Sequence, residues 1–222
     1  MLEVSLTQKA FTVFGVNVGL SVVTAWVVLA VLLIALVLLN LLVVRRMQTQ
    51  PKGVQNVLEL IVGGVDKWCK GKVGENAGRF VAPVVMTLML YVFSTTVVEL
   101  FGFSPATEDI NCTFALGLCT FLTVNVTGVR FRGVKGRLEG LCSPTPIVAP
   151  IRVMTDFIAP CSIAIRLFAN VMVGGIIMQL IYAVVPILLP AIVASYFSVL
   201  HTGIQSFVIG LLCLVYVSEA VE

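Results

Sequence analysis

The sequence is short of charge: Asp, Glu, Lys and Arg make up only 11% of its 222 residues, and there is one histidine. A soluble domain carries about 25% charged residues, so this chain has too few to cover a surface in water. Hydrophobic residues make up 59% of the chain, and the mean hydropathy is +1.09. These values exclude disorder, and no repeat indicates collagen or a coiled coil. The composition therefore predicts a membrane protein with several transmembrane segments.

Motifs for metal or nucleotide binding are also missing. The six cysteines include no Cys-x-x-Cys pair, and a single histidine leaves no metal-ligand spacing, so we expect neither a disulfide framework nor a metal site. Gly71-Lys72 is followed by Val73, which does not fit a phosphate-binding loop. We therefore expect no cofactor, no nucleic-acid partner and no nucleotide chemistry on this chain.

Five apolar stretches are long enough, or nearly so, to cross a bilayer as helices, which takes about 20 residues each. We predict an all-α polytopic membrane protein whose residues 1–222 form a single membrane domain. The spans are expected at 18–44, 80–103, 112–129, 153–185 and 191–217. The first run is too long for the apolar part of a signal peptide, so we expect it to be a span.

The basic residues predict the orientation. Twelve of the 14 Lys and Arg residues fall in 45–79 and 130–152. With five crossings these segments lie on one side, which the positive-inside rule makes the cytoplasmic side, so the N-terminus is expected outside and the C-terminus inside. Apolar residues in 47–79 recur at helical spacing, which predicts an interfacial amphipathic helix, and 130–137 is expected to be a basic loop.

The two C-terminal helices are predicted to be long and tilted. The stretch 153–183 would measure about 46 Å at 1.5 Å per residue, against a hydrocarbon core of about 30 Å. We therefore expect it to tilt strongly, to bend at Pro160, or both. Pro186 and Pro190 are expected to make the turn that separates it from the last span.

Arg166 lies deep inside the fourth span. An arginine there costs at least about 2.5–3.5 kcal/mol and cannot lose its proton, so it needs an acidic partner or water. One explanation is a static ion pair with an acid of this chain such as Glu99; the other is a water-filled cavity. Asn170 and Gly174 follow on the same helix face, which suits a surface past which another helix moves. Ordinary close packing of helices at Gly174-Gly175 is equally compatible with the pattern.

His201 and Gln205 lie one turn apart on the last span and share a face. Histidine titrates near neutral pH, and polar residues inside membranes usually face the bundle interior or water. A proton relay through His201 and a simple interhelical hydrogen bond both fit this placement.

The segment Ser162–Asn170, which reads SIAIRLFAN, resembles the signature of subunit a of F-type ATP synthases. Further positions fit the same family, in the same order and at similar separations: Pro83, Thr87, Asp109-Ile110-Asn111, Gln205-Ser206-Phe207 and Tyr216-Val217-Ser218-Glu219-Ala220. The resemblance covers about 54–222.

This resemblance implies a stator subunit beside a rotating ring of c subunits, together with peripheral-stalk b subunits and the rest of the synthase. The complex would lie in the lipid bilayer of an energy-transducing membrane, such as a bacterial inner membrane or its organelle equivalent. Arg166 would meet the carboxylate of each c subunit between two half-channels, with Asn170 and Gln205 on the ring-facing surface. Asp109 and Asn111 would lie near a channel mouth.

The ion is expected to be a proton, and ATP chemistry would belong to other chains, so no catalytic residue is expected here. The alternative is an ion-coupled secondary transporter, although the five unequal spans show no paired repeat.

The sequence departs from the family pattern at three positions. Gly175 stands where a Glu or His is often found, Arg152 replaces a frequent acid, and Glu99 stands where an Asn is common. Since glycine cannot titrate, we hypothesise that Glu99 and His201 supply the titratable groups of the outer half-channel.

Overall fold

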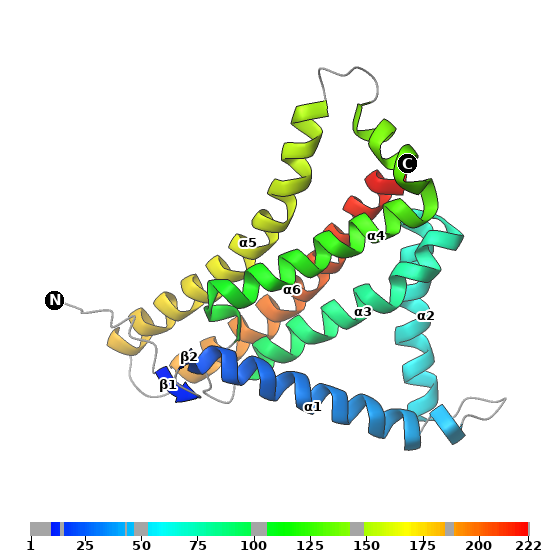
Figure 1. Ribbon diagram of the computed structural model, residues 1–222. Helices are drawn as coiled ribbons and strands as arrows, with labels where there is room; N and C mark the ends of the chain where they lie inside the picture. The colour runs from blue at the N-terminus through cyan, green and yellow to red at the C-terminus, as the bar shows by residue number, and fades with distance from the viewer. Residues whose placement is uncertain are drawn as a thin grey trace.

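The computed structural model describes residues 10–13, 16–42, 44–46, 53–98, 106–142, 149–184 and 189–221. A bundle is formed by α3 (Glu75–Val97), α4 (Ile110–Cys142), α5 (Ala149–Val184) and α6 (Leu189–Val221). Within it α3, α4 and α6 run side by side, and α5 packs against α4 (Figure 1). The predicted all-α fold is confirmed, since five helices are long and apolar enough to cross a membrane.

Two short strands precede the first helix. β1 (Ala10–Val13) and β2 (Val16–Gly19) pair antiparallel, and α1 (Leu20–Leu42) follows at once, with the 3-10 turn η1 (Val44–Arg46) after it. The predicted span therefore began two residues early. Valine favours strands because its branched side chain packs well on a pleated surface, which explains why an apolar run starts as a hairpin.

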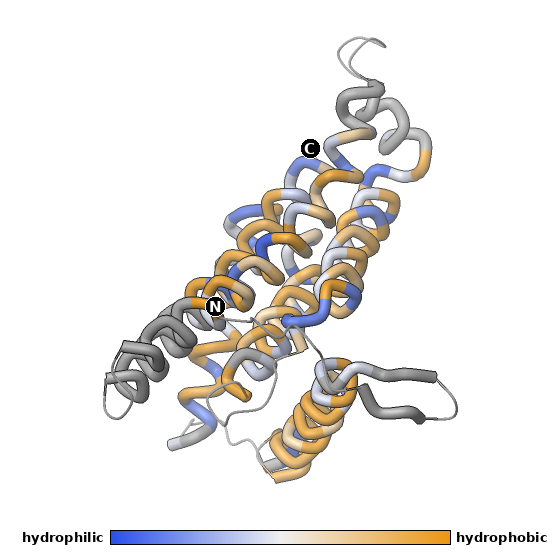
Figure 2. The backbone as a smooth tube through the Cα atoms, turned by 90° about the vertical axis from the view of Figure 1, so that its left-hand side faces the viewer, coloured by the Kyte–Doolittle hydropathy of each residue, from blue (hydrophilic) through white to orange (hydrophobic). Residues whose placement is uncertain are grey.

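Among the described residues, the buried positions of helix α1 all lie near its start. Ser21, Ala25 and Val28 are buried there, where α1 meets α3 and the short turn η3 (Ala106–Glu108). Only 11% of its most apolar window is buried, against 44% for the window in α6. Apolar residues run along its whole length (Figure 2), and Trp26 is 75% exposed. A surface this apolar is typical of contact with lipid or with another protein.

The predicted amphipathic helix is confirmed as α2 (Val54–Val73), and Gly74 ends it. Gly74 has φ 89°, in the left-handed region that glycine tolerates, and its N–H donates to the carbonyl of Lys70 at 3.0 Å. Helix α3 therefore begins at Glu75, before the predicted residue 80. A Cβ on Gly78 would lie 2.7 Å from the Cα of Lys70, so the two helices meet closely. The interfacial position of α2 stays a prediction.

The prediction of a basic loop at 130–137 was wrong. Helix α4 continues through this segment, with a break at Gly133, where φ is 75° and ψ is 164°. Arginine and lysine are good helix formers, so the segment extends the helix, and of its two glycines Gly133 interrupts it. The guanidinium of Arg130 lies 4.7 Å from the centre of the Phe80 ring, which anchors this part of α4 to α3.

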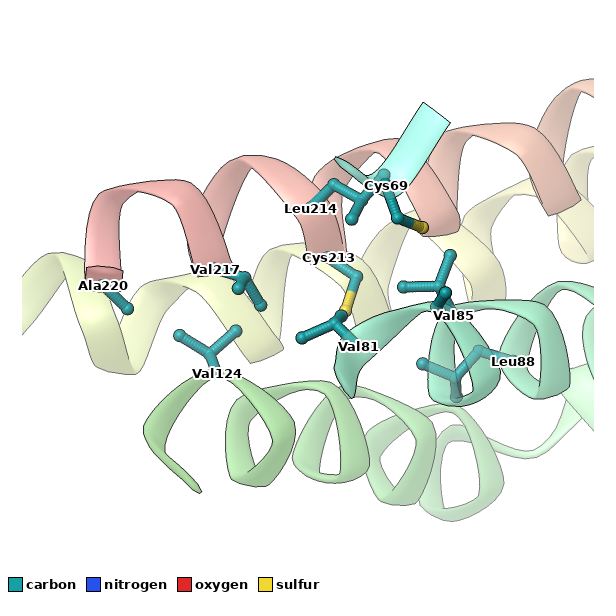
Figure 3. Close-up of a cluster of buried hydrophobic side chains, with 10 residues drawn as sticks. Cys69, Val81, Val85, Leu88, Val124, Cys213, Leu214, Val217 and Ala220 are labelled. Carbon is teal, nitrogen blue, oxygen red and sulfur yellow. The ribbon is translucent and has the colours of Figure 1, made fainter. Parts of the chain in front are cut away.

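The largest cluster of buried side chains joins α2, α3, α4 and α6 near the C-terminus (Figure 3). Cys69 and Cys213 are fully buried within it and act as small apolar residues. Burial, together with the nearby carboxylate of Asp66, raises the pKa of the Cys69 thiol to about 11. The cluster therefore fixes α2 against the bundle and holds an unreactive thiol.

A stripe of small residues lets α4 approach its neighbours. Thr113, Gly117, Thr120 and Thr127 are buried, and each threonine hydroxyl donates to a carbonyl of its own helix. A Cβ on Gly117 would lie 2.4 Å from the carbonyl oxygen of Pro160 in α5. Small residues of this kind allow membrane helices to pack backbone to backbone.

Helix α5 has 36 residues and would measure about 54 Å if straight. It is bent along its length (Figure 1). Pro160 lies inside the helix, as predicted, and favours a bend because proline removes one helix hydrogen bond. The expected turn residue Pro186 lies outside the described residues. Pro190 lies in the first turn of α6, where a backbone N–H has no acceptor within the helix, so proline costs no helix hydrogen bond there.

Candidate functional site

Arg166 is near the middle of its span. The apolar segment of α5 covers Met154–Ile176, which places Arg166 about 18 Å along it from Met154. Arg166 is exposed, whereas its neighbours Ile163 and Leu167 are each 2% exposed and face the bundle. Among the described residues no carboxylate lies within ion-pair distance of its guanidinium. The charge therefore points away from the other helices, toward whatever covers this face.

Asn170 and Gln205 are brought together by the fold although 35 residues separate them in the sequence. The Asn170 amide Nδ2 donates to Oε1 of Gln205, and the bond links α5 to α6 one turn beyond Arg166. Gln205 is 7% exposed and Asn170 is half-buried. The pair thus lies about one helical turn from Arg166 and is less exposed than the arginine.

The glycines after Asn170 have open space around them. A Cβ added to Gly174 or to Gly175 would meet no heavy atom of the described structure within 4 Å. Close packing against a described helix of this chain is therefore not their role. The face that begins at Arg166 therefore carries polar or small side chains, and the described helices leave it accessible to another protein.

Asp109 and Asn111 form the cap of α4. Oδ1 of Asp109 accepts from the backbone N–H of Asn111 at 2.9 Å and from its side-chain amide at 3.0 Å. The backbone carbonyl of Asp109 accepts the N–H of Thr113, which closes the first helical turn. The sequence did not indicate this capping role. Asn111 is exposed and Asp109 half-exposed, so both remain reachable from outside the bundle.

The other two predicted site residues are less fully placed. His201 lies in α6, one turn before Gln205, on the same helix face. Glu99 lies outside the described residues, two positions after the end of α3. The proposed ion pair between Glu99 and Arg166 therefore stays a prediction.

The sequence did not indicate a pocket that the structure forms between α4, α5 and α6. Four polar side chains of these helices line it: Thr120, Asn125, Asp156 and Tyr216. Asp156 was recognisable in the sequence, since an acid inside an apolar span is a functional candidate. The other three polar residues were not recognisable as its neighbours, because they come from distant segments.

Comparison with known proteins identifies the family. Residues 22–218 match the ATP synthase A chain family. The chain is 33% identical over 202 residues to ATP synthase subunit a 3 of Pelobacter propionicus, covering 89% of this chain and 85% of that protein. It is 31% identical over 207 residues to ATP synthase subunit a of Trichlorobacter lovleyi, covering 91% and 87% of the two chains. The chain therefore belongs to the ATP synthase A chain family, as a non-catalytic membrane subunit a of an F-type ATP synthase that takes part in proton transport.

Proposed function

We propose that Arg166 is the fixed charge of a proton-translocating stator and faces the carboxylates of a rotating c-ring between two half-channels. The observation that carries the proposal is the exposure of Arg166 at mid-span, on a face that Gly174 and Gly175 leave open. Membership of the family favours this role over an ion-coupled secondary transporter.

The charge of Arg166 has two effects in this mechanism. It favours the deprotonated form of a passing carboxylate, by about 4 kcal/mol at 4 Å if the effective dielectric constant is about 20. It also blocks a direct proton path between the half-channels, because arginine does not give up its own proton. A carboxylate partner in turn offsets the cost of holding the arginine inside the membrane.

We propose the orientation from the basic residues, with the N-terminus outside and the C-terminus on the cytoplasmic side. The arrangement of the helices supports it. The C-terminus lies at the same end of the bundle as the last turns of α4 and the junction between α2 and α3 (Figure 1). Both basic segments reach this end, at Arg79 in α3 and at Arg130 in α4.

Purification in mild detergent, with the partners identified by mass, tests the assignment. We expect the chain to copurify with a small, two-helix hydrophobic subunit, with b subunits of the peripheral stalk and with the ATP-hydrolysing part of the synthase. An exposed, charged face in mid-span predicts such a partner, since alone it would meet lipid. Recovery of a homo-oligomer without the small subunit would contradict the proposal.

For the outer half-channel we propose Glu99 and His201 as the titratable groups. With the C-terminus inside, His201 lies outward of Gln205 along α6, and Glu99 follows the outer end of α3. Gly175, which occupies the neighbouring helix beyond Arg166, cannot carry a proton.

Glu99→Gln and His201→Ala are each expected to lower proton-driven ATP synthesis in membranes by about ten-fold, because water can replace part of a proton-transfer group. Glu59→Gln serves as the control, since Glu59 is exposed on α2 and accepts a hydrogen bond from Gln55 that glutamine also accepts. Wild-type rates in both variants would remove the hypothesis.

A further inference from the structure

The pocket between α4, α5 and α6 has a closed floor and a half-open rim. Thr120, Pro160 and Ile163 form the floor and are buried, with Thr120 and Ile163 at 1% and 2% exposure. Asp156 and Tyr216 are half-exposed at the rim. The pocket therefore opens to the outside of the protein beside a carboxyl group and ends against apolar side chains.

The polar lining suits water. Nδ2 of Asn125 donates to the carbonyl of Phe121 at 2.9 Å, which turns one end of the amide to its own helix. The hydroxyl of Thr120 likewise bonds the carbonyl of Leu116 at 3.1 Å. Asp156 is the pocket's carboxyl group, and an acid within an apolar span is stable as a charge only where water or polar partners reach it.

The pocket lies toward the basic end of the bundle in α5 and α6. It uses the middle part of α4, the early part of α5 and the last part of α6. Asp156 precedes Arg166 by ten residues, so it is about 15 Å nearer to the end that the proposed orientation places in the cytoplasm.

A continuous ridge of α5 leads from the pocket to Arg166. Asp156, Ala159, Ser162 and Arg166 follow one another at spacings of three, three and four residues, which makes each the surface neighbour of the next. Ala159 and Ser162 are half-exposed and small, so their side chains leave room for water along this ridge. On the ridge Ser162 offers a hydroxyl that can both donate and accept hydrogen bonds.

We propose that Asp156 is the proton-transfer group of the inner side, which links the level of Arg166 to cytoplasmic water. The inference rests on the proposed function. During synthesis a c-ring carboxylic acid would give its proton to water near Ser162. This water would protonate the Asp156 carboxylate, and Asp156 would then release the proton to water at the rim and become charged again. Only O–H bonds break and form, and the sequence reverses during pumping.

Passive proton conductance of membranes stripped of the ATP-hydrolysing part tests this role. We expect Asp156→Asn to lower the conductance by about ten-fold, less than the ~100-fold that a positioned acid–base group contributes in a closed site, because the rim admits water. Asp156→Glu should conduct like the wild type, since it restores a carboxylate, and Glu59→Gln should also be unaffected. Millimolar formate should restore much of the conductance of Asp156→Ala, after correction for its effect on wild-type membranes.

The outcomes separate this inference from the proposed function. If Arg166→Lys abolishes coupled synthesis but Asp156→Asn conducts at the wild-type rate, only the role of Asp156 fails. If Arg166→Lys stays coupled, the proposed function fails itself. If the Asp156→Asn subunit does not accumulate in the membranes, the conductance of Asp156→Glu membranes tests the role of Asp156 instead. Slow proton conductance in membranes with assembled Asp156→Glu overturns that role. Formate that leaves assembled Asp156→Ala unchanged overturns it as well.

Discussion

Replacement of Arg166 by lysine is expected to reduce coupled ATP synthesis to below about 1% of the wild-type rate, which is about 2.7 kcal/mol at 1.36 kcal/mol per factor of ten. Lysine keeps the charge but not the planar fork of five donors that fits a carboxylate. Inside a membrane, burial also lowers the pKa of an ammonium group, so lysine can release its proton and open the path between the half-channels. Synthesis driven by an imposed proton gradient in vesicles measures the loss.

Arg79→Lys is the matched control, because Arg79 is exposed on α3 outside the proposed site. It should leave synthesis unchanged. ATP hydrolysis by the same membranes shows whether the complex has assembled around the Arg166→Lys subunit. Near-normal synthesis by the assembled variant would refute the role of Arg166.

Gly117→Leu is expected to destabilise the subunit by about 3 kcal/mol or more, since overpacking costs 1–3 kcal/mol even where side chains can adjust. At Gly117 the first added atom would lie 2.4 Å from a backbone oxygen, that of Pro160, so α4 and α5 must separate. The variant should accumulate poorly in membranes and unfold at lower denaturant concentration than the wild type. Because α5 carries Arg166, the remaining protein should also synthesise ATP poorly.

Gly64→Ala provides the comparison. A Cβ on Gly64 would meet no heavy atom within 4 Å of the described structure, so alanine there should stabilise α2 slightly through its higher helix propensity. Gly117→Ala should already lower the amount of subunit in the membrane. Wild-type amounts and stability of Gly117→Ala would contradict the close approach of α4 and α5.

Much of the fold was predictable because a bilayer demands long apolar helices. The five spans follow from this demand, and the fourth span is long enough to include the proline of α5. The amphipathic helix followed from the helical spacing of its apolar residues. The boundaries were less predictable, since they depend on short-range backbone preferences. The hairpin before α1 and the break at Gly74 use residues whose hydropathy resembles that of the adjoining helices. Likewise the charge of 130–137 suggested a loop, although its arginine and lysine residues favour a helix.

The site was predictable where chemistry stands out in an apolar background. Arg166 is recognisable alone because its charge is costly in a membrane. The hydrogen bond between Asn170 and Gln205 was not predictable in detail, because it depends on how α5 and α6 align. The pocket beside Asp156 was hidden for the same reason, since three separate helices form it.

The bond between Asn170 and Gln205 has a mechanical consequence under the proposed rotary mechanism. Every step of a rotor pushes sideways on the stator residue that attracts it, so α5 must resist a repeated lateral force at Arg166. The bond passes part of that force to α6, and the adjacent Ser206 hydroxyl, which donates to the carbonyl of Met89 at 2.7 Å, passes it on to α3. Two polar contacts thus brace one helix against torque.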